Sequence, residues 1–315
     1  MVWQCCIDFQ RDRGQIIYSN KFLDRFAYQE AKARKKISKT EFGTFRDCSS
    51  LGRLFDFFSS SQPTDNANVN ITQLGDRLVS LTETPFPVIF ESETLTTIGK
   101  LEYEPKVKGQ VTTAHPHFDF QRDRAYSYQT HFARNSSYQI YYLNAREVSQ
   151  NLLCTIPVDK PAYMHSFGIT DNYLILVEFP LVANPLSLAT SDIVGKAFIE
   201  NYRWKSQLKT RFTIVSKDDG SLVSTSIGEP FFAFHHVNAF EQENEIILDI
   251  TAYPDAKAID SFYLDNLREG KTNLSQCHLH FGWWNCSGYC FKSRTKRAGK
   301  QTNYQTNSNN CEGLW

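Results

Sequence analysis

Residues 165–177 read HSFGITDNYLILV, and this stretch decides the fold class. A histidine opens a short run, Asp171-Asn172 supplies a turn, and an apolar run rich in branched and aromatic side chains follows. This layout is typical of two antiparallel β-strands joined by a tight turn. The same order of histidine, strand, turn and strand recurs at residues 115–128 and 235–248. The chain therefore has a weak internal repeat of β-hairpins.

The strand signal extends on both sides of the repeat, from about residue 69 to residue 253. Two further hairpins are predicted, one over residues 69–81 with Gly75-Asp76 as its turn and one over residues 212–223. Strands this short and numerous predict an all-β sandwich, barrel or propeller. The spacing of the repeat favours a propeller, because a blade takes about 40–50 residues in familiar repeats.

Composition excludes several classes of protein. Lys+Arg and Asp+Glu each number 34, so the formal net charge is zero and no nucleic-acid partner is expected. Hydrophobic residues make up 41% of the chain, which argues against wholesale disorder. The 24 Phe, 15 Tyr and 5 Trp can fill a core and still line an apolar pocket. No protein partner is indicated.

The expected compartment is the cytoplasm. The N-terminus reads MVWQCCIDFQRDR and lacks the apolar stretch of a secretory signal, and no window approaches the ~18 apolar residues of a membrane-spanning helix. Without a signal, the eight cysteines are expected to be reduced thiols rather than a disulfide framework.

The repeat carries a candidate metal site. The inner strands of propeller blades face one axis, so one histidine from each repeat can converge there: His115 or His117, then His165, then His235 or His236. Neutral imidazoles suit iron, zinc, copper or nickel. The alternative is three unrelated structural histidines. His131 has no comparable context and is interpreted as structural. Glu83, at the end of an apolar strand, either orients a ligand histidine or is an exposed acid.

Five stretches, in this order along the chain, resemble the carotenoid cleavage oxygenase family, which includes β-carotene oxygenases and the retinal-pigment-epithelium isomerase. They are TDNANVN (64–70), LTETP (81–85), TAHPHFD (113–119), PAYMHSFGIT (161–170) and FFAFHHVNAFE (231–241). The resemblance covers about Ile7 to Arg268. Several long motifs in the family's order make it specific.

The resemblance implies a seven-bladed β-propeller with a non-haem Fe(II) held by four histidines. By motif, His115, His165 and His235 match three of these ligands, and Glu83 matches a glutamate that hydrogen-bonds a ligand histidine. It also implies that O2 is used to split a conjugated C=C bond of a carotenoid or apocarotenoid into aldehyde products. Residues 1–270 are assigned to a partial propeller domain.

The sequence also departs from the family. The family's opening blade segment and the region that supplies the fourth histidine are not found, and residues 271–315 are expected to be a divergent, irregular or disordered tail. His278 and His280 do not match the family's last histidine motif. Two alternatives therefore stay open: an inactive remnant that binds apolar polyenes or nothing, and a family-related isomerase or hydrolase acting on retinoid-like lipids.

Residues 179–189, FPLVANPLSLA, are apolar and interrupted by two prolines. Proline removes a ladder hydrogen bond, so this segment is not expected to form a central strand. The resemblance implies peripheral contact with a membrane here, where a lipid-dissolved substrate enters. The alternative is an apolar loop that covers the tunnel.

Overall fold

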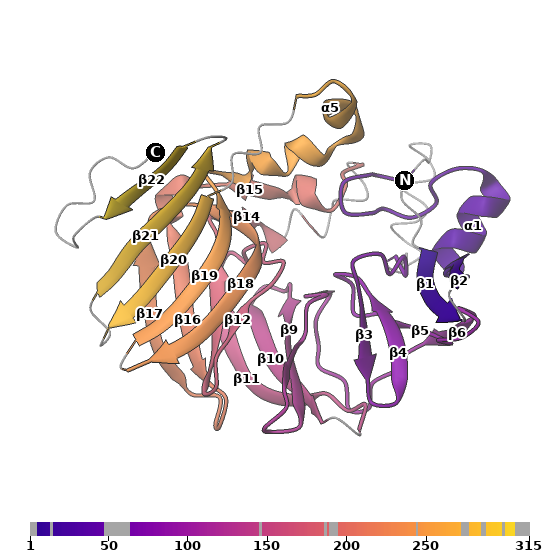
Figure 1. Ribbon diagram of the computed structural model, residues 1–315, viewed down its shortest axis with the longest axis horizontal. Coiled ribbons are helices and arrows are strands. Elements are labelled where there is room, and N and C mark those ends of the chain that lie inside the picture. Colours follow the sequence, from indigo (N-terminus) through magenta and orange to yellow (C-terminus); the bar gives the residue numbers. More distant parts are fainter. Residues whose placement is uncertain are drawn as a thin grey trace. The chain divides into compact units, whose positions relative to one another are not determined.

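The computed structural model describes the backbone of residues 5–12, 15–46, 64–144, 147–185, 188, 195–243, 245–271, 277–284, 288–297 and 300–305 (Figure 1). Side chains are described from Tyr18 to Lys271 within these ranges. The chain divides into two compact units, one of Met1–Pro161 with Asn184–Asn201, the other of Ala162–Ala183 with Tyr202–Trp315.

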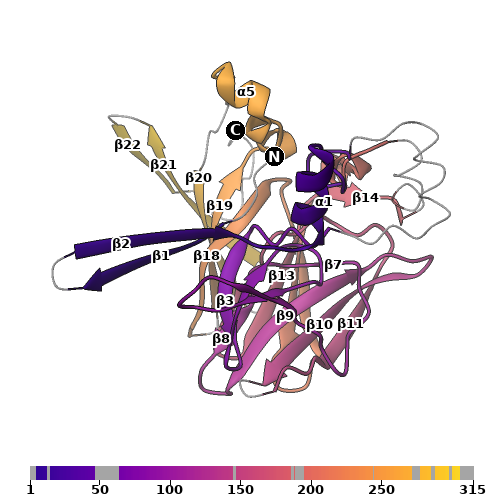
Figure 2. The same ribbon diagram turned by 90° about the vertical axis from the view of Figure 1, so that its right-hand side faces the viewer.

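The first unit consists mainly of antiparallel sheets. One sheet has the order β3 (Asn70–Leu74), β4 (Arg77–Leu81), β5 (Val88–Phe90), β6 (Thr97–Lys100). A second has the order β11 (Asn151–Val158), β10 (Ser136–Asn144), β9 (Arg124–His131), with β7 (Val111–Thr112) and β8 (His117–Asp119) both paired with β9. Figure 2 shows β9, β10 and β11 side by side.

The predicted hairpin over residues 69–81 is confirmed. Strand β3 pairs with β4, and the register brings Leu74 opposite Arg77 across the Gly75-Asp76 turn. Gly75 has φ 61°, a left-handed conformation that a residue without Cβ adopts at no steric cost. Leu74 and Val79 are buried in the core of this unit.

Two further elements complete the first unit. Strands β1 (Cys5–Asp12) and β2 (Gln15–Phe22) form a two-stranded ribbon, which Figure 2 shows clearly. Helix α1 (Phe26–Arg34) follows, and the Asp65 carboxylate accepts hydrogen bonds from the backbone N–H groups of Phe26 and Ala27. These bonds satisfy donors that the first turn of a helix leaves unpaired.

The second unit also contains antiparallel sheets. One has the order β12 (Gly168–Ile169), β13 (Tyr173–Glu178), β16 (Thr210–Ser216), β17 (Leu222–Gly228). Another has the order β18 (Phe232–Gln242), β19 (Glu245–Tyr253), β20 (Cys277–Trp284), β21 (Gly288–Arg297), β22 (Lys300–Gln305). The short strands β14 (Leu181–Ala183) and β15 (Tyr202–Trp204) pair with each other. A helix, α5 (Leu264–Arg268), follows two 3-10 turns, Ala256–Ala258 and Asp260–Phe262.

Burial changes across the β12–β17 sheet. Nearly all of β13 is buried, whereas β17 alternates between exposed and half-buried residues before it ends at a buried glycine. Strand β13 is a nearly continuous apolar run because both of its faces are covered. Strand β17 is the edge strand of the sheet, and its Leu222, Val223 and Ile227 are exposed. The hairpin predicted over residues 212–223 is confirmed as β16 and β17. The all-β expectation is also confirmed.

Part of the chain after residue 270 differs from the expected irregular tail. Strand β20 pairs with β19 from Ala252↔Cys277 to Glu245↔Trp284, and β21 and β22 continue the sheet. The backbone groups at a sheet edge can pair with any extended segment. Strands β20 to β22 can therefore form without an alternation of apolar and polar side chains, which is the pattern that a sequence would reveal. Whether residues 271–315 form a separate domain stays a prediction.

The segment from Phe179 to Ala189 is partly a strand. Phe179, Leu181, Val182 and Ala183 are buried, and three of them form β14. The membrane contact that the resemblance implies for this segment stays a prediction. Leu186 lies outside the described residues. Among the described helices, none is both long enough and apolar enough to cross a bilayer.

Among the described side chains, Cys154 is the cysteine whose state the structure shows, and its thiol is free. Burial raises its pKa to about 11, so it is a protonated and unreactive thiol at neutral pH. The other cysteines lie outside the described side chains, and their reduced state stays a prediction.

Candidate metal centre

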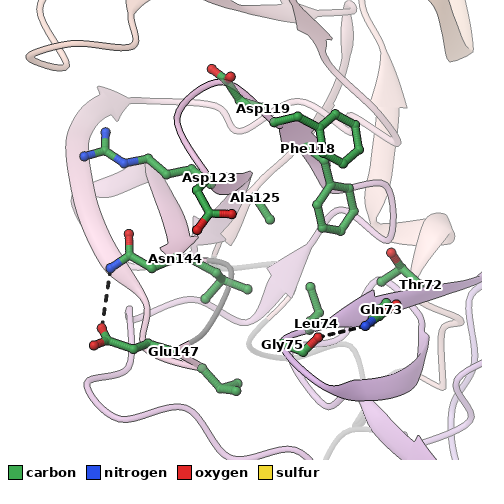
Figure 3. Close-up of a pocket in the computed structure, with 14 residues that line it drawn as sticks. Thr72, Gln73, Leu74, Gly75, Phe118, Asp119, Asp123, Ala125, Asn144 and Glu147 are labelled. Carbon is green, nitrogen blue, oxygen red and sulfur yellow. Dashed lines mark hydrogen bonds between the residues drawn. The ribbon is translucent and has the colours of Figure 1, made fainter.

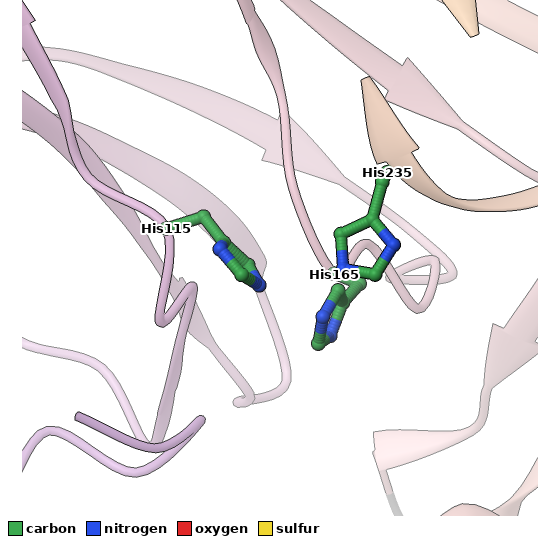
Figure 4. A group of neighbouring side chains, drawn as sticks. All are labelled: His115, His165 and His235. Atoms are coloured by element: carbon green, nitrogen blue, oxygen red, sulfur yellow. The ribbon is translucent and has the colours of Figure 1, made fainter. Parts of the chain in front are cut away.

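Two of the three predicted ligands lie side by side in the second unit. The rings of His165 and His235 stand edge to face, with centroids 4.9 Å apart and planes at 84° (Figure 4). His165 is half-buried in the loop before β12, and His235 is exposed on β18. The two residues are 70 positions apart in sequence, so tertiary structure alone brings them together.

An irregularity in β18 determines how His235 is presented. The register between β18 and β19 shifts between Ala233 and His236, and shifts again between His236 and Asn238. Such β-bulges leave backbone groups outside the ladder and redirect side chains. The bulge therefore lies at the candidate ligand itself.

Aromatic side chains surround this pair. Phe234 stands edge to face with His165 at 5.6 Å and is 6.3 Å from His235, both measured between ring centroids. The Tyr163 hydroxyl lies 3.3 Å from Nδ1 of His165. Tyr163 in turn packs against Phe232, with ring centroids 6.3 Å apart. These contacts restrict the orientation of the His165 ring and shield it from solvent.

The electrostatics at His235 favour neutral imidazole. Partial burial of the ring lowers the pKa of His235 below its ordinary value, and the neighbouring His165 lowers it further by charge repulsion. Neutral imidazole is the form that binds a transition metal. The chemistry of these donors thus fits iron, zinc, copper or nickel.

The third predicted ligand, His115, belongs to the first unit. It is half-buried in the loop between β7 and β8, and its backbone N–H donates to Oγ1 of Thr113 at 3.0 Å. This bond fixes the turn that precedes the histidine.

Glu83 is half-buried in the loop that follows β4. Its backbone carbonyl accepts a hydrogen bond of 2.8 Å from the N–H of Thr112 in β7, three residues before His115. The backbone of Glu83 is thus attached to the strand that leads to the predicted ligand. The role of its carboxylate in orienting a ligand stays a prediction.

The remaining histidines have other positions. His131 ends β9 opposite Ser137, and His117 begins β8. His236, next to His235, has its Nδ1 at 2.8 Å from Oγ of Ser166. The side chains of His278 and His280 lie outside the described residues.

Sequence reasoning missed Ser166, the residue after His165. Its side chain is buried, and Oγ contacts Phe234 and His236, which flank His235 in sequence. The one signal in the sequence that could have pointed to Ser166 is its position next to the candidate ligand His165. The partners 68 and 70 residues away could not be inferred from the sequence.

A pocket of about 330 Å³ lies elsewhere in the first unit (Figure 3). It is bordered by the β3–β4 turn, the β8–β9 turn and the end of β10, and the Phe118 ring faces it. None of the candidate ligands lines this pocket. It is therefore not the cavity of the histidine pair.

Antiparallel sheets of four or five strands, with a histidine at or shortly before the first strand of several hairpins, are typical of a β-propeller protein. A family model described as "Retinal pigment epithelial membrane protein" matches residues 1–311. The chain belongs to this family, which includes the carotenoid cleavage oxygenases.

Curated relatives agree with this assignment. A mitochondrial carotenoid-cleaving dioxygenase of Macaca fascicularis is 33% identical over 294 residues, which cover 87% of this chain and 53% of the relative. A β,β-carotene 15,15'-dioxygenase of Gallus gallus is 28% identical, covering 82% of this chain and 53% of the relative. The chain thus spans about half the length of the curated relatives it matches.

Solved structures confirm the propeller fold. A mutant of Synechocystis ACO superposes with a TM-score of 0.72 at 22% identity, covering 95% of this chain and 71% of the other. The cobalt-substituted Synechocystis ACO gives a TM-score of 0.71 at 21% identity, covering 94% and 71%. At this identity the likeness supports the fold and not the activity.

Proposed function

We propose that this chain is a non-haem Fe(II)-dependent oxygenase that uses O2 to cleave a conjugated C=C bond of a carotenoid or apocarotenoid, giving aldehyde products. The observation that carries the proposal is the pairing of His165 and His235 at 4.9 Å within motifs of the family. Curated relatives named as carotenoid-cleaving dioxygenases support the substrate class.

In this proposal the metal ligands are the three histidines that the family motifs assign, His115, His165 and His235. All three donors are imidazoles, a set that suits Fe(II) and leaves coordination positions open. When bound, the iron would supply the binding and activation of O2. Glu83 is proposed to hold the second ring N–H of one ligand, because metal-bound histidines commonly donate that proton to a carboxylate.

The aromatic side chains have a separate task in the proposal. Phe234 and Tyr163 border the histidine pair, and Phe262 stands edge to face with Phe234 at 5.7 Å. The buried Tyr163 ring helps to exclude water, and the more exposed rings of Phe234 and Phe262 present π surfaces to a flat polyene. Such surfaces also stabilise cationic character that develops on the substrate.

The test is anaerobic loading of the full chain with Fe(II), followed by incubation with an apocarotenal and O2 and chromatographic detection of shorter aldehydes. We expect product from wild type and from the control His131→Ala, and at least a hundredfold less from His165→Ala. A folded, iron-loaded wild type that gives no aldehyde would contradict the proposal.

The same experiment separates the alternatives. A product that retains all carbons, with no O2 consumed, would indicate an isomerase. Absence of stoichiometric iron in the folded chain would favour a polyene-binding remnant.

A further inference from the structure

We propose that Ser166 is a positioning residue that fixes His235 relative to His165, an inference that rests on the proposed metal site. The serine directly follows one candidate ligand in sequence. Its Oγ donates a hydrogen bond of 2.7 Å to the carbonyl of Phe234 and accepts one of 3.1 Å from the N–H of His236. These two backbone groups belong to the residues immediately before and after the other candidate ligand.

The Ser166 hydroxyl has its full complement of partners. A hydroxyl has one proton to donate and two lone pairs to accept with. The bond to Phe234 uses the proton, the His236 N–H uses one lone pair, and Nδ1 of His236 at 2.8 Å occupies the third direction. With Ser166 only 4% exposed, no water replaces these bonds without opening the site.

The bulge in β18 explains why such a bond is needed. Because the β18–β19 register shifts on both sides of His236, the ladder does not hold this part of the strand regularly. Backbone groups released by a bulge need another partner when they are buried. The Ser166 hydroxyl is that partner, so it determines where the strand places His235.

A second contact between the same segments lies farther from the histidines and offers a matched control. At the other end of β12, the Thr170 hydroxyl donates to the Glu241 carboxylate on β18. The backbone N–H and the Nδ2 of Asn172 donate to the same carboxylate at 2.8 and 2.9 Å. Loss of the Thr170 bond should weaken the attachment of β12 to β18 without altering the backbone beside His235.

The experiment compares Co²⁺ binding by the full chain, wild type, Ser166→Ala and Thr170→Val, under anaerobic conditions. Visible absorption gives the dissociation constant and the ligand-field spectrum, and thermal unfolding gives the midpoint. We expect Ser166→Ala to weaken Co²⁺ binding at least tenfold and to shift the absorption bands, as loss of groups that orient metal ligands does. Thr170→Val should lower the midpoint but bind Co²⁺ within about twofold of wild type.

Ser166→Thr retains the hydroxyl and is expected to restore Co²⁺ affinity and the wild-type spectrum. If Ser166→Ala does not fold, Ser166→Thr carries the test, and a folded Ser166→Thr with a tenfold loss would overturn the inference. Equal effects of Ser166→Ala and Thr170→Val on affinity would also overturn it. Failure of wild type itself to bind Co²⁺ would overturn the proposed metal site as well, so the two failures are distinguishable.

Discussion

The imidazole rings of His165 and His235 stand edge to face at 4.9 Å, although one residue precedes β12 and the other lies on β18. At this separation two neutral rings can contribute nitrogens to one ion, whereas two protonated rings would repel each other. The pair is the part of the candidate metal site that lies within one compact unit, and the first prediction concerns it.

Substitution His235→Ala should weaken Co²⁺ binding by at least tenfold, because it removes one of the imidazole ligands. The matched control is His131→Ala, which removes a histidine that ends β9 opposite Ser137 and is not a candidate ligand. Titration followed by visible absorption at pH 7.5 measures both dissociation constants. Indistinguishable losses in the two variants would show that His235 is not a ligand.

Arg211→Met should lower the free energy of unfolding by about 2–4 kcal/mol, because it leaves a buried carboxylate without its cation. Arg211 donates two hydrogen bonds, from Nε and Nη2, to the two carboxylate oxygens of Glu178, which is 5% exposed. The two residues are direct cross-strand partners on β13 and β16.

The control for this change is Lys209→Met, which removes an exposed ion pair of 3.0 Å with Glu229. Exposed pairs contribute about 0–1 kcal/mol, so the midpoint in urea should barely move. A loss for Arg211→Met no larger than that of the control would contradict the importance of the buried pair.

Glu41 should make stability fall as the pH rises from about 4.5 to about 7. Burial is the main cause that raises its pKa from 4.5 to about 7, against the opposing hydrogen bond from the Thr64 hydroxyl. The folded state therefore holds this proton in a pH range where the unfolded state has released it, and unfolding becomes easier as the pH increases.

Glu41→Gln should remove this dependence and make the variant gain on wild type between pH 5 and pH 8, by on the order of 2–3 kcal/mol. Urea unfolding at several pH values measures the difference. If the unfolding free energies of wild type and Glu41→Gln change in parallel with pH, the raised pKa of Glu41 is contradicted.

Gly168→Ala should cost about 1–3 kcal/mol, because a Cβ at this position would lie 2.8 Å from Cδ1 of Leu248. Gly168 in β12 packs against Leu248 in β19, which pairs with the strand that carries His235. This contact between Gly168 and Leu248 therefore contributes to the packing beside the candidate metal centre. Gly99→Ala is the control, since no atom lies within 4 Å of its added Cβ. It should change the unfolding free energy by less than about 0.5 kcal/mol, and similar losses in both variants would contradict the packing argument.

Local signals predicted the strands and turns well. Gly75-Asp76 between two apolar runs gave the β3–β4 hairpin, and the histidine-led repeats gave β8–β9, β12–β13 and β18–β19. Turn residues and runs of branched and aromatic side chains act within a few positions, so the sequence alone reveals them. Strands β20 to β22 were not predicted, because pairing along a sheet edge depends on the backbone of another segment.

By itself the amino-acid sequence determined the all-β class, the order of the hairpins, the candidate histidines and membership in the family. Tertiary structure decided how closely the His235 ring stands beside His165, where β18 bulges, and which groups of the bulge Ser166 contacts. The reason is physical: those choices depend on hydrogen bonds and ring contacts between groups about 70 residues apart. Such contacts leave no periodic pattern in the chain, and they exist only once the sheets have packed.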